Sequence, residues 1–278
     1  MFSKRNLIIS LILSATSAVA APDVYVDTFG GQFGTLDLTT GAFTQIGPLN
    51  PDPLLGLVPG ANGSLLGVSL GGNLDAVNPA TGVVSVIGAT GMGPAPATSP
   101  FDTGEFYGTV YATDGNNNLY TVNMTTGAAS LIGATGLAPC PSVTDPTGLG
   151  DEAFFAAGGN FYLTFDGFDY VTNAVLVAPA LYQINPTTGA ATLIGPTAFG
   201  IDAALQVNGT VYAFTSADAV LSLNVANGST SFVTNYDPSA MDITGAAQTP
   251  EPTLFGLLGI GIAAILIAKR RGMHGLQR

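Results

Sequence analysis

Between residues 21 and 249 the chain alternates apolar and polar residues in short runs, which Gly, Asn, Asp and Pro separate from one another. A period of two is typical of β-strands, and turn-forming residues between such runs mark where one strand ends and the next begins. The segment has no long stretch with the 3.6-residue period and capped start of an amphipathic helix. The pattern therefore predicts an all-β domain over residues 21–249.

Five segments of this domain repeat one order: a strand, then Asn or Asp, a short linker, Gly, and a second strand. They read FGTLDLTTGAFTQIG, NLDAVNPATGVVSVIG, NLYTVNMTTGAASLIG, LYQINPTTGAATLIG and VLSLNVANGSTSFV. The turn glycines, which are separated by 41, 45, 62 and 39 residues, are Gly41, Gly82, Gly127, Gly189 and Gly228. A period of about 40–45 residues with several strands a unit is typical of propeller blades. We therefore expect a β-propeller of about five four-stranded blades.

Each repeated segment supplies the outer two strands of a blade, so the inner two strands should lie upstream of it. The clearest inner pair is 201–206 with 210–214, joined by Asn208-Gly209, a strong hairpin signal. Similar pairs are 54–58 with 64–69 and 153–157 with 161–165. The first unit starts on strand 23–27 without an inner partner, whereas a spare strand, 240–244, follows the fifth unit. We expect these two strands to pair, so that the N- and C-terminal strands close the ring and no open edge remains.

The separation of 62 residues predicts one blade with two insertions, at about 136–150 and 166–179, which we expect to form loops on one face. Two alternatives stay open at this point. One is a β-sandwich, and the other is a ring with a sixth, degenerate blade within the longer interval.

Charge is distributed very unevenly along the chain. The six Lys and Arg residues all lie in the terminal segments, and the single His is His274. Of the 18 acidic residues, all but Glu251 lie between 21 and 249, which gives this segment 17 carboxylates and no cation. Such a segment cannot neutralise phosphates, so nucleic acid and anionic lipid are excluded as its partners.

The N-terminus has the features of a secretory signal peptide, which we place at residues 1–20. Lys4 and Arg5 precede the apolar run 7–13, and small residues lead to a cleavage site after Ala20. An N-terminal membrane anchor is the alternative for this segment.

The C-terminus has the features of a membrane span. Residues 254–268 contain no charged residue, and the basic stop Lys269, Arg270 and Arg271 follows at once. With two preceding residues the span is about 17 residues long, the short limit for a transmembrane helix. The basic cluster would remain in the cytoplasm, which places residues 21–249 outside it. A buried core helix is the alternative.

Immediately before this span stand Pro250, Glu251 and Pro252. The order Pro-Glu-Pro, short Gly-rich apolar helix and Arg-rich stop resembles the PEP-CTERM sorting signal of exopolysaccharide-producing Gram-negative bacteria. The resemblance covers residues 250–278 and implies that a membrane enzyme, exosortase, is a partner that recognises these three residues and removes the tail during export. It also implies a transient stay in the inner membrane, then release to the cell surface or the extracellular matrix. Residues 272–278 depart from the pattern, since such tails commonly end soon after the basic cluster.

Few catalytic patterns are available to this sequence. Ser69 lies in a Gly-x-Ser-x-Gly match, but the only His lies beyond the membrane stop, so we interpret Ser69 as a strand end. Cys140 is the only cysteine and forms no internal disulfide. Carboxylates remain as possible Ca²⁺ ligands, and the weak candidates are Asp114, Asn116 and Asn118, although their spacing does not match that of an EF-hand loop.

These observations favour a non-enzymatic exported protein without a cofactor, with a structural, adhesive or ligand-binding role. Its expected partners are the secretion machinery, the membrane through the C-terminal helix, and extracellular polysaccharide or other surface proteins. The alternative is a Ca²⁺-dependent propeller hydrolase or lactonase in which carboxylates of the central channel hold the metal.

Overall fold

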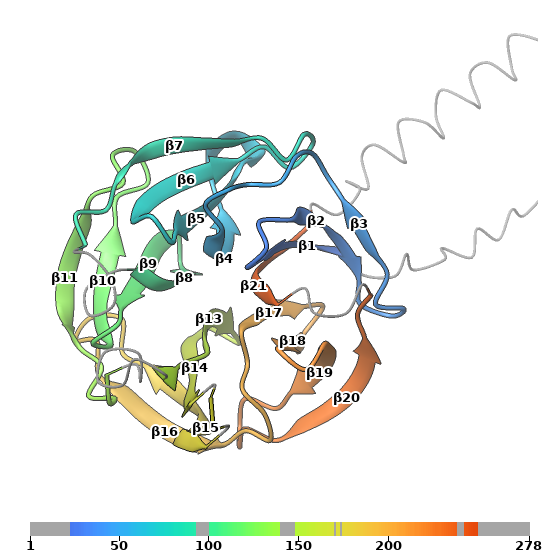
Figure 1. Cartoon of the computed structure of the whole chain (residues 1–278). Coiled ribbons are helices and arrows are strands. Elements are labelled where there is room, and N and C mark those ends of the chain that lie inside the picture. The colour runs from blue at the N-terminus through green and yellow to red at the C-terminus, as the bar shows by residue number, and fades with distance from the viewer. Residues whose placement is uncertain are drawn as a thin grey trace, which may run out of the picture.

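The computed structural model describes residues 23–92, 100–139, 148–169, 171–172, 174–237 and 242–249. In these residues the chain forms 21 β-strands and one short 3₁₀ turn, η1 (Ala61–Gly63). The strands assemble into five antiparallel sheets that surround a common axis (Figure 1). The protein is thus an all-β, five-bladed β-propeller, and neither a sandwich nor a six-bladed ring.

The strands of each blade follow one another from the axis outward. Blade 1 contains β21 (Ile243–Gln248), β1 (Asp23–Thr28), β2 (Phe33–Asp37) and β3 (Phe43–Gln45). Blade 2 contains β4 (Leu54–Pro59), β5 (Leu65–Ser69), β6 (Asn73–Val77) and β7 (Val84–Ala89). Blade 3 contains β8 (Pro100–Phe106), β9 (Thr109–Asp114), β10 (Asn118–Val122) and β11 (Ala129–Ala134).

Blade 4 contains β13 (Glu152–Ala157), β14 (Asn160–Asp169), β15 (Val175–Ile184) and β16 (Ala191–Pro196), with the two-residue β12 (Gly148–Leu149) added beside β14. Blade 5 contains β17 (Ala203–Val207), β18 (Thr210–Thr215), β19 (Ala219–Leu223) and β20 (Thr230–Asn235). The predicted inner hairpins are therefore confirmed in blades 2, 4 and 5.

The ring closes by the pairing of its two terminal strands, as expected. Strand β21 lies antiparallel to β1, with Val24 opposite Gln248 and Thr28 opposite Ile243. The closing strand begins three residues later than the predicted 240–244, however, because the small residues Gly245 and Ala246 belong to it. Small residues have low strand propensity, but here they let the strand approach β4 closely: a Cβ on Gly245 would lie 2.8 Å from the backbone of Gly56.

The hydrophobic core consists of five clusters, one between each pair of neighbouring blades. Val26 of β1 and Phe214 of β18, for example, are fully buried between blades 1 and 5. Because every blade buries both of its faces, apolar residues point to both sides of the inner strands.

The repeated turn binds each blade to the one before it. In NPTTG, the Asn185 side chain accepts hydrogen bonds from the backbone N–H groups of Thr187 (2.9 Å) and Thr188 (3.2 Å). The glycine that ends the turn has positive φ and also lies against the preceding blade. In blade 3, a Cβ on Gly127 would lie 2.3 Å from the Gly88 carbonyl of blade 2. Only glycine fits such a position.

The prediction of two loops in blade 4 is wrong for residues 166–179. This segment extends β14 and β15 into a long hairpin, in which Phe168 pairs with Val175 and Gly167 with Val177. Residues Gly148–Leu149, at the end of the other insertion, form β12 and pair with β14 of this hairpin. A strand ladder pairs the backbone N–H and C=O groups of this segment, and its β-branched residues favour the extended strand conformation.

Candidate functional site

The central channel is closed, mostly by small residues. It is lined by all five innermost strands, and its lining residues are Gly56, Leu57, Asp102, Thr103, Ala153, Phe154, Ala203, Ala204, Thr244, Gly245 and Ala246. The space in the channel that the centre of a water molecule can reach is about 10 Å³. That is room for roughly one water. The channel therefore does not admit an organic ligand.

Asp102 is the one titratable side chain of this lining. Its Oδ1 accepts a hydrogen bond from the Thr103 N–H (2.6 Å), and its Oδ2 accepts one from the Phe154 N–H of blade 4 (2.6 Å). Burial raises the pKa of Asp102 well above its usual range, although both hydrogen bonds oppose the shift. Asp102 thus links blades 3 and 4, and its oxygens are already committed.

Glu152 of β13 lies beside Asp102 and is also buried. Its Oε1 accepts a hydrogen bond from the Thr113 hydroxyl of blade 3 (2.5 Å), while its Oε2 has no partner in the described part of the chain. Burial, together with the proximity of Asp102, raises the pKa of Glu152 well above its usual range. Two carboxyl groups without a cation are stable here because they keep their protons.

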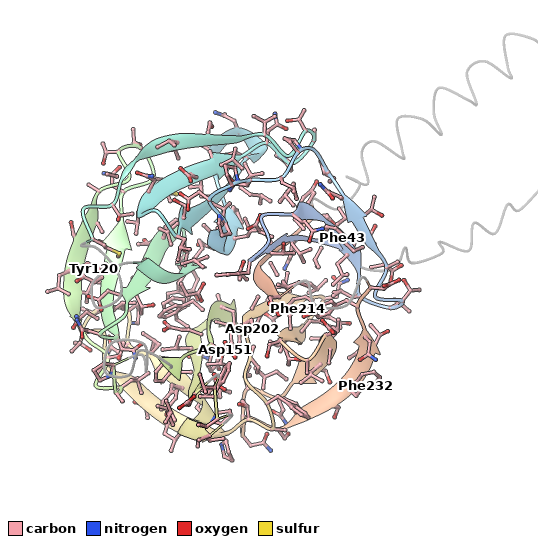
Figure 2. All side chains as sticks on the ribbon, in the orientation of Figure 1. Phe43, Tyr120, Asp151, Asp202, Phe214 and Phe232 are labelled. Carbon is pink, nitrogen blue, oxygen red and sulfur yellow. The ribbon has the colours of Figure 1, made fainter. Side chains whose placement is uncertain are left out.

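A larger group of carboxyls lies at one mouth of the channel. Asp151 and Asp202 stand immediately before the innermost strands β13 and β17, and Figure 2 shows them close together near the axis. Their side chains share a hydrogen bond. Burial raises the pKa of both carboxyls, and repulsion from neighbouring carboxyls adds to the shift.

Asp166 and Asp242 complete this acidic cluster. Asp166 of β14 accepts a hydrogen bond from the Asp151 N–H (3.2 Å), and burial followed by repulsion from Asp151 raises its pKa to about 7. Asp242, just before β21, adds to the repulsion that raises the pKa of Asp151 and of Asp202. The acidic cluster is thus a group of neighbouring carboxyls that share protons. Among the described residues, no three His, Cys, Asp or Glu side chains have the arrangement of a metal site.

The calcium candidates form a closed turn between β9 and β10. Asp114 Oδ1 accepts hydrogen bonds from the N–H groups of Asn116 (3.0 Å) and Asn118 (2.9 Å), and its Oδ2 accepts one from the Tyr120 hydroxyl (2.9 Å). The Asn118 amide also donates to Asp114. Burial, together with the hydrogen bond that the Tyr120 hydroxyl donates to Asp114, raises the pKa of Tyr120 to about 12. The structure thus brings Asp114 and Asn118 together as a turn, and calcium binding by them stays a prediction.

Other sequence candidates have simple positions or fall outside the described residues. Ser69 is buried at the end of β5, as interpreted from its pattern. The signal-cleavage residue Ala20, Cys140, His274, the sorting residues Pro250, Glu251 and Pro252, the span 254–268 and the stop Lys269, Arg270 and Arg271 lie outside the described residues. In the described part of the chain, no helix has the length and apolar character needed to cross a bilayer.

Sequence reasoning missed the acidic cluster. Its members are scattered between positions 151 and 242, and only the ring brings blades 4, 5 and 1 together at the channel mouth. One signal was available: Asp151, Asp202 and Asp242 each stand one or two residues before the buried part of an innermost strand. Aligning the blades on those strands would have superimposed the three carboxyls.

A shallow hollow of about 480 Å³ lies on blade 2, along β6 and the turn that follows it. It is lined by hydroxyl, amide and aliphatic groups, namely Ser64, Ala76, Val77, Asn78, Pro79, Thr81, Val83 and Ser85. None of these side chains titrates, so the hollow offers no acid or base.

Comparison with known proteins shows no family for this chain. No family model matches the chain, and no curated protein matches it. Among solved structures it resembles a protein of unknown function from Bacteroides thetaiotaomicron (15% identity, 75% of this chain and 49% of that one, TM-score 0.39). It also resembles BamB from Moraxella catarrhalis (13% identity, 82% of this chain and 74% of that one, TM-score 0.34). A third similar structure is the extracellular domain of a hybrid two-component system from B. thetaiotaomicron (12% identity, 82% of this chain and 29% of that one, TM-score 0.40). The chain spans about half the length of the first of these proteins.

Proposed function

We propose that this protein is exported and non-enzymatic, that residues 250–278 are its PEP-CTERM sorting tail, and that the propeller has a structural, adhesive or ligand-binding role at the cell surface or in the extracellular matrix. The observation that carries the proposal is the position of the chain ends. Strand β21 ends at Gln248, and the Thr249 hydroxyl donates a hydrogen bond to the Asp23 carbonyl (2.7 Å). The leader and the tail therefore join the ring at one point, and both can be removed without loss of a strand.

The chemistry of the channel supports a role without catalysis. Catalytic bases, Schiff-base amines and oxyanion clamps are mostly His, Lys and Arg, which do not occur between residues 21 and 249. The carboxyl that lines the channel, Asp102, binds backbone N–H groups of two blades. A hydrolase of the calcium-dependent kind needs carboxylate oxygens that are free to bind metal and a space for substrate beside them. Elemental analysis tests this alternative, since one tightly held Ca²⁺ per chain would favour it.

Replacing Pro250, Glu251 and Pro252 by Ala in the native host tests the sorting role. We expect the wild-type protein outside the cell with a C-terminus near residue 250, as measured by the mass of the intact protein. The triple variant should keep its tail and remain in the membrane fraction. Thr253→Ala is the matched control, since it changes the same segment but leaves the tripeptide intact. An unchanged C-terminal mass and location in the triple variant would contradict the proposal.

A further inference from the structure

The two faces of the ring differ, and the face away from the chain ends is the one we call the distal face. Strand β1 begins at Asp23, with Val24 opposite Gln248, and runs to Thr28 opposite Ile243. The chain ends thus lie on one face, and the starts of the innermost strands, with the loops beside them, lie on the other. The distal loops that follow β1, β3 and β5 are residues 29–32, 46–53 and 70–72.

Three large apolar side chains are exposed on these distal loops. Phe29 is 55% exposed, Leu49 59% and Leu70 46%. On the opposite face, the exposed large apolar side chains of the described residues lie in separate turns: Val83 in the β6–β7 turn, Tyr107 in the β8–β9 turn and Met124 in the β10–β11 turn.

Backbone hydrogen bonds hold these distal loops together as one surface. The Asn50 N–H donates to the Gly31 carbonyl (2.8 Å), which joins the loops of Leu49 and Phe29. The Leu70 N–H donates to the Pro53 carbonyl (3.1 Å), which joins the third loop. A surface that is ordered before binding loses little conformational entropy when a partner arrives.

Carboxyl groups border this apolar surface. The Phe29 N–H donates to the carbonyl of Asp242 (2.9 Å), and Asp52 accepts a hydrogen bond from the Gly71 N–H (2.9 Å) beside Leu70. Asp242 is exposed, and it continues the border into the acidic cluster through its interaction with Asp151 and Asp202. No cationic side chain between residues 21 and 249 compensates these groups. Any partner must therefore bring the positive charge.

We propose that the distal face docks a segment of a partner protein that combines Lys or Arg with apolar side chains. The apolar groups would cover Phe29, Leu49 and Leu70, and the cations would lie against Asp52 and Asp242. A second propeller is unsuitable as the occupant because it supplies no cation. The proposal rests on the ligand-binding role above and names the surface and the kind of ligand.

Binding of a defined peptide tests the proposal. The probe is a short fluorescent peptide of alternating Lys and Leu, titrated by anisotropy against the full-length chain in a non-ionic detergent. Two distal variants are Asp52→Asn with Asp242→Asn, and Phe29→Ser with Leu70→Ser. Asn keeps a hydrogen-bond acceptor for Gly71 and tolerates the positive φ of Asp242 (42°), so folding should be preserved.

The matched controls remove the same groups from the opposite face. They are Asp23→Asn with Glu105→Gln, and Tyr107→Ser. We expect each distal variant to bind the peptide about tenfold more weakly, as at interface hot spots, and the controls to bind like the wild type. A peptide with Glu in place of Lys should not bind.

Three outcomes would overturn the proposal: no binding by the wild type, equal losses in the distal and control variants, or displacement of the peptide by stoichiometric Ca²⁺. The second outcome would mean non-specific attraction to an acidic protein, and the third a metal site instead of a docking surface. The result is independent of tail processing, because the peptide assay does not require export. Failure of the sorting experiment is therefore distinguishable from failure of this one.

Discussion

At the scale of single residues, the structure buries carboxyl groups where no cation can pair with them. Asp27 is fully buried, its Oδ2 accepts a hydrogen bond from the Leu54 N–H (3.0 Å), and its Oδ1 has no partner within the described residues. Burial raises the pKa of Asp27 to about 8, despite the opposing hydrogen bond. Like Asp102 and Glu152, it joins two blades in the neutral form.

These groups predict an unusual pH dependence of stability. A carboxyl whose folded pKa is about 8 or 7, as for Asp27 and Asp166, keeps its proton between pH 4 and pH 7, where the unfolded chain has lost it. The folded state then binds more protons, so the free energy of unfolding falls as pH rises, by about 1.4 kcal/mol per pH unit for each such group. We expect a higher thermal midpoint at pH 5 than at pH 8.

Asp27→Asn provides the control for this pH dependence. Asn can still accept from Leu54 and cannot ionise, so the variant should lose less stability than the wild type between pH 5 and pH 8. Circular dichroism melts at the two pH values measure both. A wild-type midpoint that rises toward pH 8 would contradict the argument.

The glycines allow a second prediction, because two of them separate strain from contact. Gly127 and Gly209 both have positive φ (79° and 83°), but only Gly127 lies against a neighbouring blade, and a Cβ on Gly209 would meet nothing within 4 Å. Gly209→Ala should lower the free energy of unfolding by about 1–2 kcal/mol, which is the cost of the left-handed backbone conformation alone. Gly127→Ala should lower it by a further 1–3 kcal/mol, roughly, because the backbone must move. Denaturant melts compare the two, and equal losses would disprove the contact.

At the scale of the element, the repeated ending Ile-Gly of the outer strands has a structural reason. In β7, Leu74 pairs with Gly88 and Asp75 with Val86, so that Ile87 forms a bulge and packs into the core between blades 2 and 3. The residue before the bulge faces solvent, as Phe232 does on β20, where it points outward from the rim in Figure 2. The glycine then lets the strand end against the next blade's turn.

Local sequence patterns were sufficient to predict these elements. The contacts between blades could not be predicted from them, because those contacts form only when the ring closes. Asn208-Gly209 and the NPTTG type of turn fix a hairpin through neighbouring residues, so the five blades follow from the sequence. The closed channel does not, because it depends on Gly56, Ala153 and Ala203 meeting across blades that are far apart in the chain. The extended hairpin of blade 4 was missed for a related reason: its strands pair beyond the length that the repeat sets.

Closure of the ring by β21 leads to a prediction for two truncations. Removal of residues 250–278 leaves every described strand in place. Removal of residues 243–278 exposes the edge of β1 and takes Ile243, which is fully buried, out of the core between blades 1 and 5. The first truncation should unfold cooperatively at about the midpoint of the full chain, and the second should lose cooperative unfolding and aggregate. Thermal melts with size-exclusion chromatography test this, and a monomeric, cooperative second truncation would show that β21 is dispensable.

At the scale of the whole molecule, the propeller has no attractive ion pairs to offset its repulsions. Its 17 acidic residues between 21 and 249 face no Lys, Arg or His in that segment. Most proteins contain both attractive and repulsive charge pairs, so the effect of salt on their stability is small or of either sign. Here the sign is fixed, because screening can only weaken repulsion.

We therefore expect the thermal midpoint at pH 7 to rise when NaCl increases from about 10 mM to about 100 mM, where the screening length falls from about 30 Å to about 10 Å. A gain of about 1 kcal/mol corresponds to about 2–4 °C in a domain of this size. CaCl₂ at matched ionic strength separates screening from binding. Equal midpoints in the two salts mean screening alone, whereas a higher midpoint in CaCl₂ means that folded carboxylates bind Ca²⁺. A midpoint that falls with NaCl would require attractive pairs that this segment cannot form, and would contradict the account of its electrostatics.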